Sequence, residues 1–379
     1  MKKKLLIIAG EASGDLHGSS LIRELKKIDN NIELYGIGGN KMSAEGMQNL
    51  YHIKDMSFLG FAEVIKHLPF IRKVKKDLMN FVKAENIKHA VLIDYPGFNL
   101  SMAKSFKKNN VKNLYYISPQ IWAWGEGRIK KIKNLISKMI VFFPFEEKLY
   151  RDNNVNVNFV GHPLVKKFDE YDFLTKEELC KKYNLTKNKK ILLLMPGSRK
   201  QELEKILGSL LSSAKMIEDE FNMQTVVACA DNIEENFISK FTNNFDFKII
   251  KGDTYNLLKN SDFSIVKSGT STLEAAIIGS PFIVVYKTNY LTYLIGKALI
   301  KIKNIALVNI VAEKTIIKEL VQDEVNKKNI FNNAKEILSN NDKYNKLKFE
   351  LSLIKEKLKT KGNPSKKAAE IIYAELNAN

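Results

Sequence analysis

Short runs of apolar and β-branched residues alternate with amphipathic segments along the first part of the chain. Turn residues or charges bound each run, as they bound the buried strands of a parallel sheet. Between the first two runs, residues 16–28 carry apolar side chains at helical spacing. The alternation predicts a parallel sheet with helices on both faces. Its strands are expected at residues 3–9, 32–35, 89–93, 113–117, 138–143 and 157–160.

The pattern changes after residue 163, where a charged segment, residues 166–190, reads as an inter-domain linker with its own helix. A second series of strands and helices follows, and from residue 312 the tail is helical in pattern. We therefore predict an α/β protein with two Rossmann-like halves. The predicted strands of the second half are residues 191–195, 225–230, 248–250, 263–267 and 281–286, and the predicted domains are 1–164, 165–345 and the C-terminal helices 346–379.

Composition limits the function classes. The 379 residues are enough for two domains, and 45% apolar and 27% charged residues are ordinary for a folded protein. Cys180 and Cys229 are far apart and outside any CxxC pattern, which indicates a reducing compartment and neither a disulfide framework nor a zinc site. We expect no signal peptide, and no apolar run approaches the roughly 20 residues of a membrane-spanning helix.

The formal net charge of +19 is mostly lysine. Such a field attracts nucleic acid, anionic lipid headgroups or a phosphorylated substrate, and charge alone does not choose among them. A nucleic-acid-binding protein would interleave aromatic residues with Arg and Lys on one face or carry a known binding motif, and neither is found. We therefore predict no nucleic-acid partner.

The first candidate site loop follows the opening strand and contains Ser13, Gly14 and Asp15. Glycine lets a ligand approach the backbone, and the start of the next helix offers free N–H groups to a phosphate or sugar oxygen. The loop is neither a Walker loop nor GxGxxG. The alternative is a tight turn in which Ser13 or Asp15 caps the helix.

The second loop begins with Asp94, directly after the predicted strand 89–93. A carboxylate at the end of a buried strand can have a raised pKa and act as general base toward an acceptor hydroxyl. Asp-x-Pro-Gly is also good turn chemistry, so a purely structural turn is the alternative. His17, in the first loop, is a second candidate for acid–base chemistry with Asp94.

Two further loops suit a diphosphate. Gly197, Ser198 and Arg199 precede a helix, where arginine can grip phosphate with two hydrogen bonds. Residues 267–274 form a loop after another strand, with Glu274 placed to accept from ribose hydroxyls. The alternatives are a surface arginine and a capping box between Ser271 and Glu274. Together the loops indicate a nucleotide-sugar donor and an acceptor, hence glycosyl transfer. No acidic pair follows a strand of the second half, so we predict no metal and no other cofactor.

The loops taken together resemble one family, the lipid-A-disaccharide synthases, which are inverting glycosyltransferases of the GT-B fold. The matching stretches cover nearly the whole chain and are specific in combination. They are GEASGDLHG (10–18), GIGGNKM (36–42), LGFAEV (59–64), IDYPGFN (93–99), SPQIWAWGEGRIKKI (118–132), FPFE (143–146), VGHPLV (160–165), LMPGSRKQE (194–202) and SGTSTLEAA (268–276).

The resemblance implies that UDP-2,3-diacylglucosamine donates its sugar to 2,3-diacylglucosamine 1-phosphate, with Asp94 as general base. It also implies two Rossmann-like domains facing each other across a cleft, with C-terminal helices returning to the first. Where the family commonly has Ala-Pro-Asp after the base, this chain has Tyr95-Pro96-Gly97, so Asp94 acts without that second carboxylate. The implied UDP-pocket residues are Arg199, Ser268, Gly269, Thr270, Thr272, Glu274, Asn309, Glu319 and Gln322.

An acylated substrate also implies a membrane surface. Residues 56–81 hold more apolar mass than one helix face requires, and these apolar residues are followed by Arg72, Lys73, Lys75 and Lys76, as in an interfacial segment. The alternative is a core-facing helix with a solvated lysine face. We expect a cytoplasmic protein bound peripherally to the inner face of the inner membrane, and the sequence leaves open whether it forms a homodimer. The candidate acyl contacts are Phe58, Leu59, Phe61, Val64 and Ile65.

Two related enzyme classes would share the donor loops: UDP-N-acetylglucosamine epimerases and the glycosyltransferase of peptidoglycan lipid assembly. They are expected to lack the stretches LGFAEV and WAW, which this chain has. We keep them as the alternative function.

Overall fold

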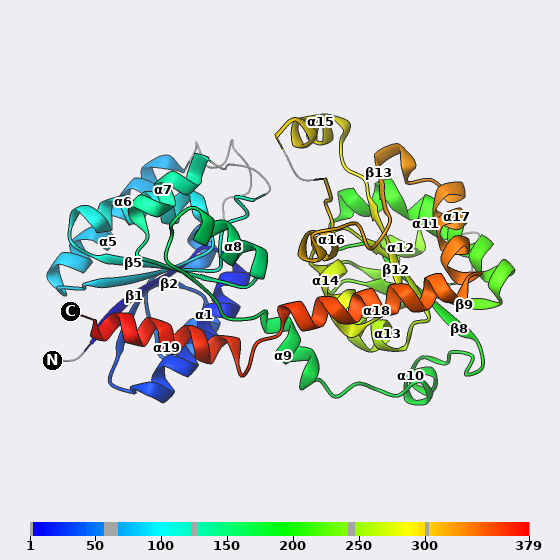
Figure 1. Cartoon of the computed structure of the whole chain (residues 1–379), viewed down its shortest axis with the longest axis horizontal. Coiled ribbons are helices and arrows are strands. Elements are labelled where there is room, and N and C mark those ends of the chain that lie inside the picture. The colour runs from blue at the N-terminus through cyan, green and yellow to red at the C-terminus, as the bar shows by residue number, and fades with distance from the viewer. Residues whose placement is uncertain (1–2, 57–66, 123–126, 242–246, 300–302, 379) are drawn as a thin grey trace. The chain divides into compact units, whose positions relative to one another are not determined.

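The computed structural model describes residues 3–56, 67–122, 127–241, 247–299 and 303–378 (Figure 1). The chain divides into two compact units. Unit 1 contains Met1–Pro163 and Leu358–Asn379, and unit 2 contains Leu164–Lys357. Each unit is built on a parallel sheet.

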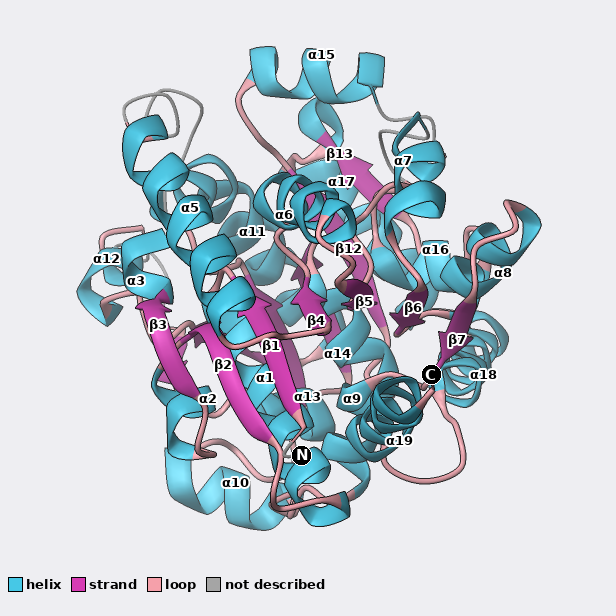
Figure 2. Ribbon diagram, turned by 90° about the vertical axis from the view of Figure 1, so that its left-hand side faces the viewer, coloured by secondary structure: helices cyan, strands magenta, loops and turns pink. Residues whose placement is uncertain are grey.

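The described part of unit 1 has a sheet with strand order β3-β2-β1-β4-β5-β6-β7, and Figure 2 shows β3 at one edge. All neighbouring strands are parallel. β3 is the strand that the sequence pattern did not reveal, because its polar side chains sit on a partly exposed edge. The strands are β1 (Lys4–Ala9), β2 (Glu33–Gly38), β3 (Gln48–His52), β4 (His89–Ile93), β5 (Lys112–Tyr116), β6 (Lys138–Val141) and β7 (Val157–Phe159).

Helices cover both faces of this sheet. Alternate residues of β1 point to opposite faces, so Leu5 and Ile7 belong to one apolar cluster and Leu6 and Ile8 to the other. The C-terminal helix α19 contacts α1 and packs on the Leu5 side. The described helices of unit 1 are α1 (Ala12–Ile28), α2 (Asn40–Ala44), α3 (Ile53–Met56), α5 (Leu68–Ala84), α6 (Pro96–Lys108), α7 (Gly127–Leu135), α8 (Pro144–Asp152) and α19 (Pro364–Asn377).

Unit 2 repeats the topology, with strand order β10-β9-β8-β11-β12-β13. The order of each sheet reverses once, between β1 and β4 and between β8 and β11, as in Rossmann-like folds. The predicted α/β class with two such halves is confirmed. The strands are β8 (Lys190–Met195), β9 (Met223–Cys229), β10 (Lys248–Lys251), β11 (Phe263–Lys267), β12 (Phe282–Tyr286) and β13 (Glu319–Val321).

Two expectations about unit 2 are corrected. The tail from residue 312 is not helical throughout, because β13 pairs with β12; a three-residue strand is too short to show a periodicity. Residues 166–190 are part of unit 2 and not a linker, since Lys182 and Tyr183 both bond the buried Asp253. The described helices are α9 (Pro163–Asp169), α10 (Lys176–Tyr183), α11 (Lys200–Phe221), α12 (Glu235–Ser239), α13 (Thr254–Asn260), α14 (Thr270–Ile278), α15 (Tyr290–Leu299), α16 (Leu307–Ala312), η1 (Gln322–Glu324), α17 (Lys327–Leu338) and α18 (Asn341–Leu358).

The C-terminal helices divide between the units, whereas the sequence analysis grouped residues 346–379. α18 stays with unit 2 because Tyr344 donates to the Asp262 carbonyl at 2.7 Å and Glu350 pairs with Lys314 at 2.9 Å. α19 belongs to unit 1, where Tyr373 accepts a hydrogen bond from Lys3 at 2.8 Å. Across the described ranges, none of the helices combines the length and the apolar character needed to span a bilayer.

Candidate active site

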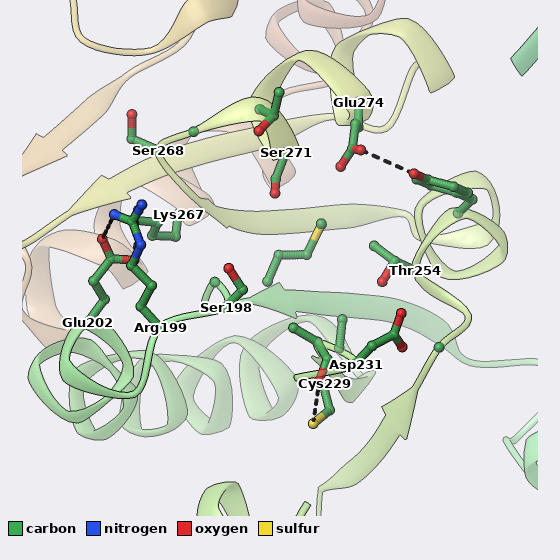
Figure 3. A pocket seen from close by; sticks show the side chains of 18 of the residues that line it. Ser198, Arg199, Glu202, Cys229, Asp231, Thr254, Lys267, Ser268, Ser271 and Glu274 are labelled. Atoms are coloured by element: carbon green, nitrogen blue, oxygen red, sulfur yellow. Dashed lines mark hydrogen bonds and ion pairs between the residues drawn. The ribbon is translucent and has the colours of Figure 1, made fainter. Parts of the chain in front are cut away.

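A cavity of about 500 Å³ opens at the point where the strand order of unit 2 reverses. Loops after neighbouring β8 and β11 form opposite walls, which is where open α/β sheets bind ligands. Its size falls in the usual range for small-molecule pockets, about 300–1,000 Å³. Figure 3 shows polar side chains gathered around it. The lining residues are Tyr171, Met195, Gly197, Ser198, Arg199, Glu202, Ala228, Cys229, Ala230, Asp231, Gly252, Thr254, Tyr255, Lys267, Ser268, Gly269, Thr270, Ser271 and Glu274.

The wall after β8 contains the predicted residues Gly197, Ser198 and Arg199. Gly197 has a φ of 102°, in the left-handed region that favours glycine. The Ser198 carbonyl accepts a hydrogen bond from Asn232 at 2.8 Å, which ties the loop to the segment that follows β9. Arg199 is the N-cap residue of α11, and its guanidinium is exposed. The loop therefore presents one exposed cation beside the free N–H groups of a helix start.

The wall after β11 is formed by Ser268, Gly269, Thr270 and Ser271. Gly269, with a φ of 156°, is the N-cap of α14, and no side chain caps this helix. The start of α14 therefore faces the cavity with its N–H groups unused by a cap. Thr272 does not line the cavity: it is fully buried and donates its hydroxyl to the Gly269 carbonyl at 2.8 Å.

Glu274 lies one turn into α14 and lines the cavity. The capping box with Ser271 is wrong, because Gly269 is the N-cap of α14 and Glu274 instead accepts a hydrogen bond from the Tyr255 hydroxyl at 3.2 Å. Burial raises the pKa of the Glu274 carboxyl, while Tyr255 and Lys167 oppose that shift. A carboxylate in this position can accept hydrogen bonds from ligand hydroxyls.

Asn309, Glu319 and Gln322 are used inside the fold and are outside the lining of this cavity. Asn309 is fully buried; its amide oxygen accepts from the Ile316 and Ile317 backbone at 2.9 and 3.0 Å. In this structure Asn309 therefore bonds within the fold, and the expected contact of these three side chains with the nucleotide stays a prediction.

The carboxylate of Glu319 has a comparable internal role. It accepts from the backbone N–H groups of Ile305 and Ala306 at 2.8 and 3.1 Å and from Asn309 at 2.7 Å. The Ile305 carbonyl in turn lies 3.4 Å from the Ser268 hydroxyl. Glu319 and Asn309 thus hold a loop that touches the cavity wall. Gln322 bonds both backbone groups of Thr288.

Sequence reasoning assigned no role to several lining residues, above all Lys267 and Glu202. They form an ion pair with a separation of 2.9 Å. Both stand within or beside recognised loops, but nothing in their spacing shows that β11 and α11 bring the two side chains together. Tyr171 and Tyr255, whose rings pack edge to face 5.5 Å apart, were also missed.

The second candidate region is the point where the sheet of unit 1 reverses, between β1 and β4. Asp94 and Tyr95 follow β4 with φ angles of 44° and 45°, in the left-handed region. Non-glycine residues in this conformation are uncommon, and such backbones cluster at functional sites. The Asp94 carbonyl is fixed by the Tyr115 hydroxyl at 2.6 Å and by the Asn99 amide at 2.8 Å.

The Asp94 side chain is half-buried, and burial raises the pKa of its carboxyl to about 6. The negative charge of Glu11, at the end of the loop after β1, adds to the rise, while the backbone N–H of Tyr95 opposes it. A carboxyl with this pKa is mostly ionised at pH 7 and is still a useful proton acceptor.

The capping alternative for the loop after β1 is wrong. Neither Ser13 nor Asp15 caps α1, because the N-cap is Glu11 without a side-chain bond. Asp15 is buried and accepts from the backbone N–H groups of Gly39, Lys41 and Met42 at 2.7, 3.1 and 3.0 Å. Its carboxylate therefore anchors the start of α2.

Of the other residues predicted to contact sugar, Gly14 is buried and Ser13 is exposed. A Cβ added to Gly14 would lie 3.1 Å from the Ala9 side chain, so glycine allows α1 to pack closely on β1. Of Ser13, Gly14 and Asp15, Ser13 is the one that is exposed and so accessible to a ligand.

His17 is half-buried, and its ring packs edge to face on Phe142 at 5.2 Å. Burial lowers the pKa of His17 to about 4, so the imidazole is neutral at pH 7. A neutral imidazole with so low a pKa is a weak proton acceptor, which favours Asp94 over His17 as the base.

Unit 1 also contains a buried acid that the sequence analysis did not single out. Glu146, in the first turn of α8, accepts the indole N–H of Trp122 at 3.3 Å. Burial raises the pKa of Glu146 to about 8, so this carboxyl is largely protonated at pH 7. Trp122 is half-buried against Phe145.

The candidate acyl contacts Phe58, Leu59, Phe61, Val64 and Ile65 lie outside the described residues. The helix that follows, α5, buries Val74 and Leu78 in the core of unit 1. Its residues Arg72, Lys73 and Lys76 are exposed. For the described part of the segment, the alternative of a core-facing helix with a basic solvated face therefore fits.

The chain is similar to known proteins over nearly its whole length. A model of the family described as lipid-A-disaccharide synthetase matches residues 5–373. A lipid-A-disaccharide synthase of Syntrophus aciditrophicus is 39% identical over 360 residues, covering 94% of each chain. One from Coxiella burnetii is 37% identical over 372 residues, covering 98% of each chain.

The fold is also found in solved structures of low sequence identity. A UDP-GlcNAc 2-epimerase from Neisseria meningitidis, bound to UDP-GlcNAc, superposes with a TM-score of 0.60 at 12% identity. The match covers 99% of this chain and 100% of that one. It supports the GT-B fold class predicted from the sequence.

Proposed function

The chain belongs to the lipid-A-disaccharide synthetase family of glycosyltransferases, and we propose that it joins two acylated glucosamines. The donor is UDP-2,3-diacylglucosamine and the acceptor is 2,3-diacylglucosamine 1-phosphate. The products are a tetraacyl β(1→6) disaccharide 1-phosphate and UDP. The polar cavity at the strand reversal of unit 2 carries this proposal, because its two walls suit the diphosphate of a nucleotide sugar.

In unit 2, Arg199 and the helix starts at Arg199 and Gly269 meet the negative charge of the diphosphate. Ser198, Ser268 and Thr270 supply further donors, and Glu274 accepts from the ribose hydroxyls. The same groups stabilise UDP as it leaves, since the negative charge on the leaving oxygen grows during transfer. Solved relatives in fold that bind UDP-sugars support this assignment, the Neisseria epimerase among them.

In unit 1, Asp94 acts as general base. Its carboxylate takes the proton of the acceptor 6-hydroxyl as the oxygen attacks the anomeric carbon of the donor. The bond from that carbon to the diphosphate oxygen breaks on the opposite face, so the configuration inverts. The raised pKa and the fixed left-handed turn at Asp94 support this role.

We also propose that the protein works peripherally at the cytoplasmic face of the inner membrane, where its acylated substrates reside. The exposed basic side of α5 and the net charge of +19 suit an anionic surface. The exposed side chains of Tyr290 and Leu294 on α15 add apolar area in unit 2.

The reaction is tested with the purified full-length chain, both substrates and mass spectrometry of the products. We expect disaccharide phosphate and UDP in equal amounts from the wild type. Asp94→Asn should lower turnover by roughly 10²–10⁴-fold, the usual contribution of a general base, and keep UDP binding. An unchanged rate would remove Asp94 as base. Conversion of UDP-N-acetylglucosamine without an acceptor would favour the epimerase alternative.

A further inference from the structure

The Glu202 carboxylate is shared by two cations at the wall of the unit 2 cavity. Its Oε2 lies 2.9 Å from the Lys267 Nζ, and its Oε1 lies 3.4 Å from the Arg199 Nη1. Figure 3 shows the three side chains together on the same side of the cavity. Lys267 ends β11 and Glu202 stands in the first turn of α11, so the trio joins both diphosphate-facing loops.

Lys267 differs from Arg199 in how firmly it is held. The Lys267 side chain is 15% exposed, whereas that of Arg199 is 78% exposed. The Lys267 ammonium lies 5.6 Å from the centre of the Tyr286 ring. Its stem runs beneath Gly197, where an added Cβ would come 3.3 Å from Lys267 Cδ. The ammonium is thus fixed directly below the loop that presents Ser198 and Arg199.

The three side chains together carry a net positive charge, which an anionic ligand can neutralise. Two cations face one carboxylate, which leaves one positive charge at the cavity wall. A sheltered lysine is costly without a counter-ion, and Glu202 supplies one while the cavity is open to water. An arriving diphosphate offers more negative charge than one carboxylate and can compete for both cations.

We propose that Lys267 is a second diphosphate ligand beside Arg199, and that Glu202 is the counter-ion which both cations exchange for phosphate oxygens. This inference rests on the proposed UDP-sugar site. On binding, the Lys267 ammonium turns from Glu202 to a phosphate oxygen without leaving its place under Gly197. Two cations beside the same carboxylate make the cavity selective for a diphosphate over a monophosphate.

The competing interpretation is a purely structural ion pair between β11 and α11. Such a pair would contribute to stability, and its loss would weaken every ligand of the cavity to the same degree. If Lys267 instead binds phosphate, its removal should lower the affinity most for the ligand with the most phosphate groups. The comparison of UDP, UMP and uridine therefore separates the two interpretations.

The test is isothermal titration of the full-length chain with UDP, UMP and uridine. Lys267→Met should weaken UDP binding at least tenfold, UMP binding less, and uridine binding not at all. Lys267→Arg should restore most of the UDP affinity. Glu202→Gln should bind UDP at least as tightly as the wild type, because the competing anion is gone. Lys205→Met is the matched control, since Lys205 is an exposed lysine of α11 outside the cavity lining.

Equal UDP affinity of Lys267→Met and Lys205→Met would overturn the inference, as would an equal loss for all three ligands. The double variant Lys267→Met/Glu202→Gln guards against misfolding, because it leaves no unpaired carboxylate; it should still bind UDP at least tenfold more weakly than Glu202→Gln. Arg199→Ala reports on the proposed function itself. If Arg199→Ala also binds UDP normally, the whole pocket assignment fails; if only Lys267→Met does, the second ligand alone fails.

Discussion

The ring of Tyr95 lies directly over Gly10, so that a Cβ on Gly10 would come 2.2 Å from the ring. Gly10 begins the first loop of unit 1, and Tyr95 follows Asp94 in the left-handed turn after β4. The Tyr95 hydroxyl is held by the Met56 carbonyl at 3.0 Å. The contact couples the loop after β1 to the position of the candidate base.

Gly10→Ala should therefore disturb the turn that presents Asp94. We expect turnover to fall at least tenfold, with UDP affinity unchanged because the nucleotide cavity is in unit 2. Steady-state kinetics and UDP titration measure the two effects separately. Gly208→Ala is the matched control: Gly208 lies in α11 with nothing within 4 Å of an added Cβ, so this change should leave turnover unchanged and stabilise the helix by about 0.5–1 kcal/mol.

The acid limb of the activity profile should report the pKa of Asp94. A base with a pKa of about 6 is protonated below that pH, so kcat/KM should rise with pH through about 6 and then level off. Glu11→Gln removes a negative charge that raises this pKa, and the limb should move to lower pH. If kcat/KM instead rises near pH 4 and Glu11→Gln does not shift this rise, His17 would be the base.

Glu146 should make the stability of the chain depend on pH. Its pKa is about 8 in the fold, against the ordinary glutamate value of 4.5, so between these values the folded state holds a proton that the unfolded chain has released. This group therefore contributes less stability as the pH rises from about 4.5 to 8. Glu146→Gln keeps an acceptor for Trp122 and cannot ionise.

The measurement compares melting temperatures of the wild type and Glu146→Gln at pH 5, 6.5 and 8. We expect the melting temperature of Glu146→Gln to rise relative to that of the wild type as the pH rises. The difference between the two proteins cancels the opposite contributions of His17 and His162, whose pKa values are lowered by burial. A difference that stays constant across this range would show that Glu146 does not carry the buried proton.

Asn309→Ala should lower the free energy of unfolding and have little effect on the UDP affinity of the folded protein. The change leaves the N–H groups of half-buried Ile316 and buried Ile317 without their acceptor, and a buried unpaired donor costs about 1–3 kcal/mol. Chemical denaturation gives the stability, and UDP titration at low temperature gives the affinity of the folded fraction. A tenfold loss of UDP affinity without a loss of stability would indicate that Asn309 contacts the nucleotide.

The peripheral-membrane proposal predicts charge-dependent binding to vesicles. Lys73→Glu/Lys76→Glu should lower co-sedimentation with vesicles that contain anionic lipid, since each basic residue near such a surface contributes about 1 kcal/mol. Lys346→Glu/Lys348→Glu changes the same net charge on exposed residues of α18 and serves as the control. Equal loss from both pairs would mean that net charge, and not the face of α5, is responsible.

The local pattern of apolar and polar residues was enough to predict the two sheets and the loops where ligands are expected to bind. Apolar runs such as residues 89–93 form strands because burial on both faces requires it, and a ligand site at the strand ends follows from parallel topology. The sequence pattern did not predict the edge strands β3 and β13. β3 is polar and half-exposed, and β13 has three residues.

Tertiary structure decided which side chains within those loops are available to a ligand. Thr272, Asn309 and Asp15 have the polarity of binding residues, yet each bonds backbone groups brought near it by the fold. Conversely, Lys267 and Glu202 are distant in the sequence and meet only because β8 and β11 are neighbours. Periodicity records the burial of a residue within its own element, whereas the partner of a polar atom depends on distant segments that the periodicity does not encode.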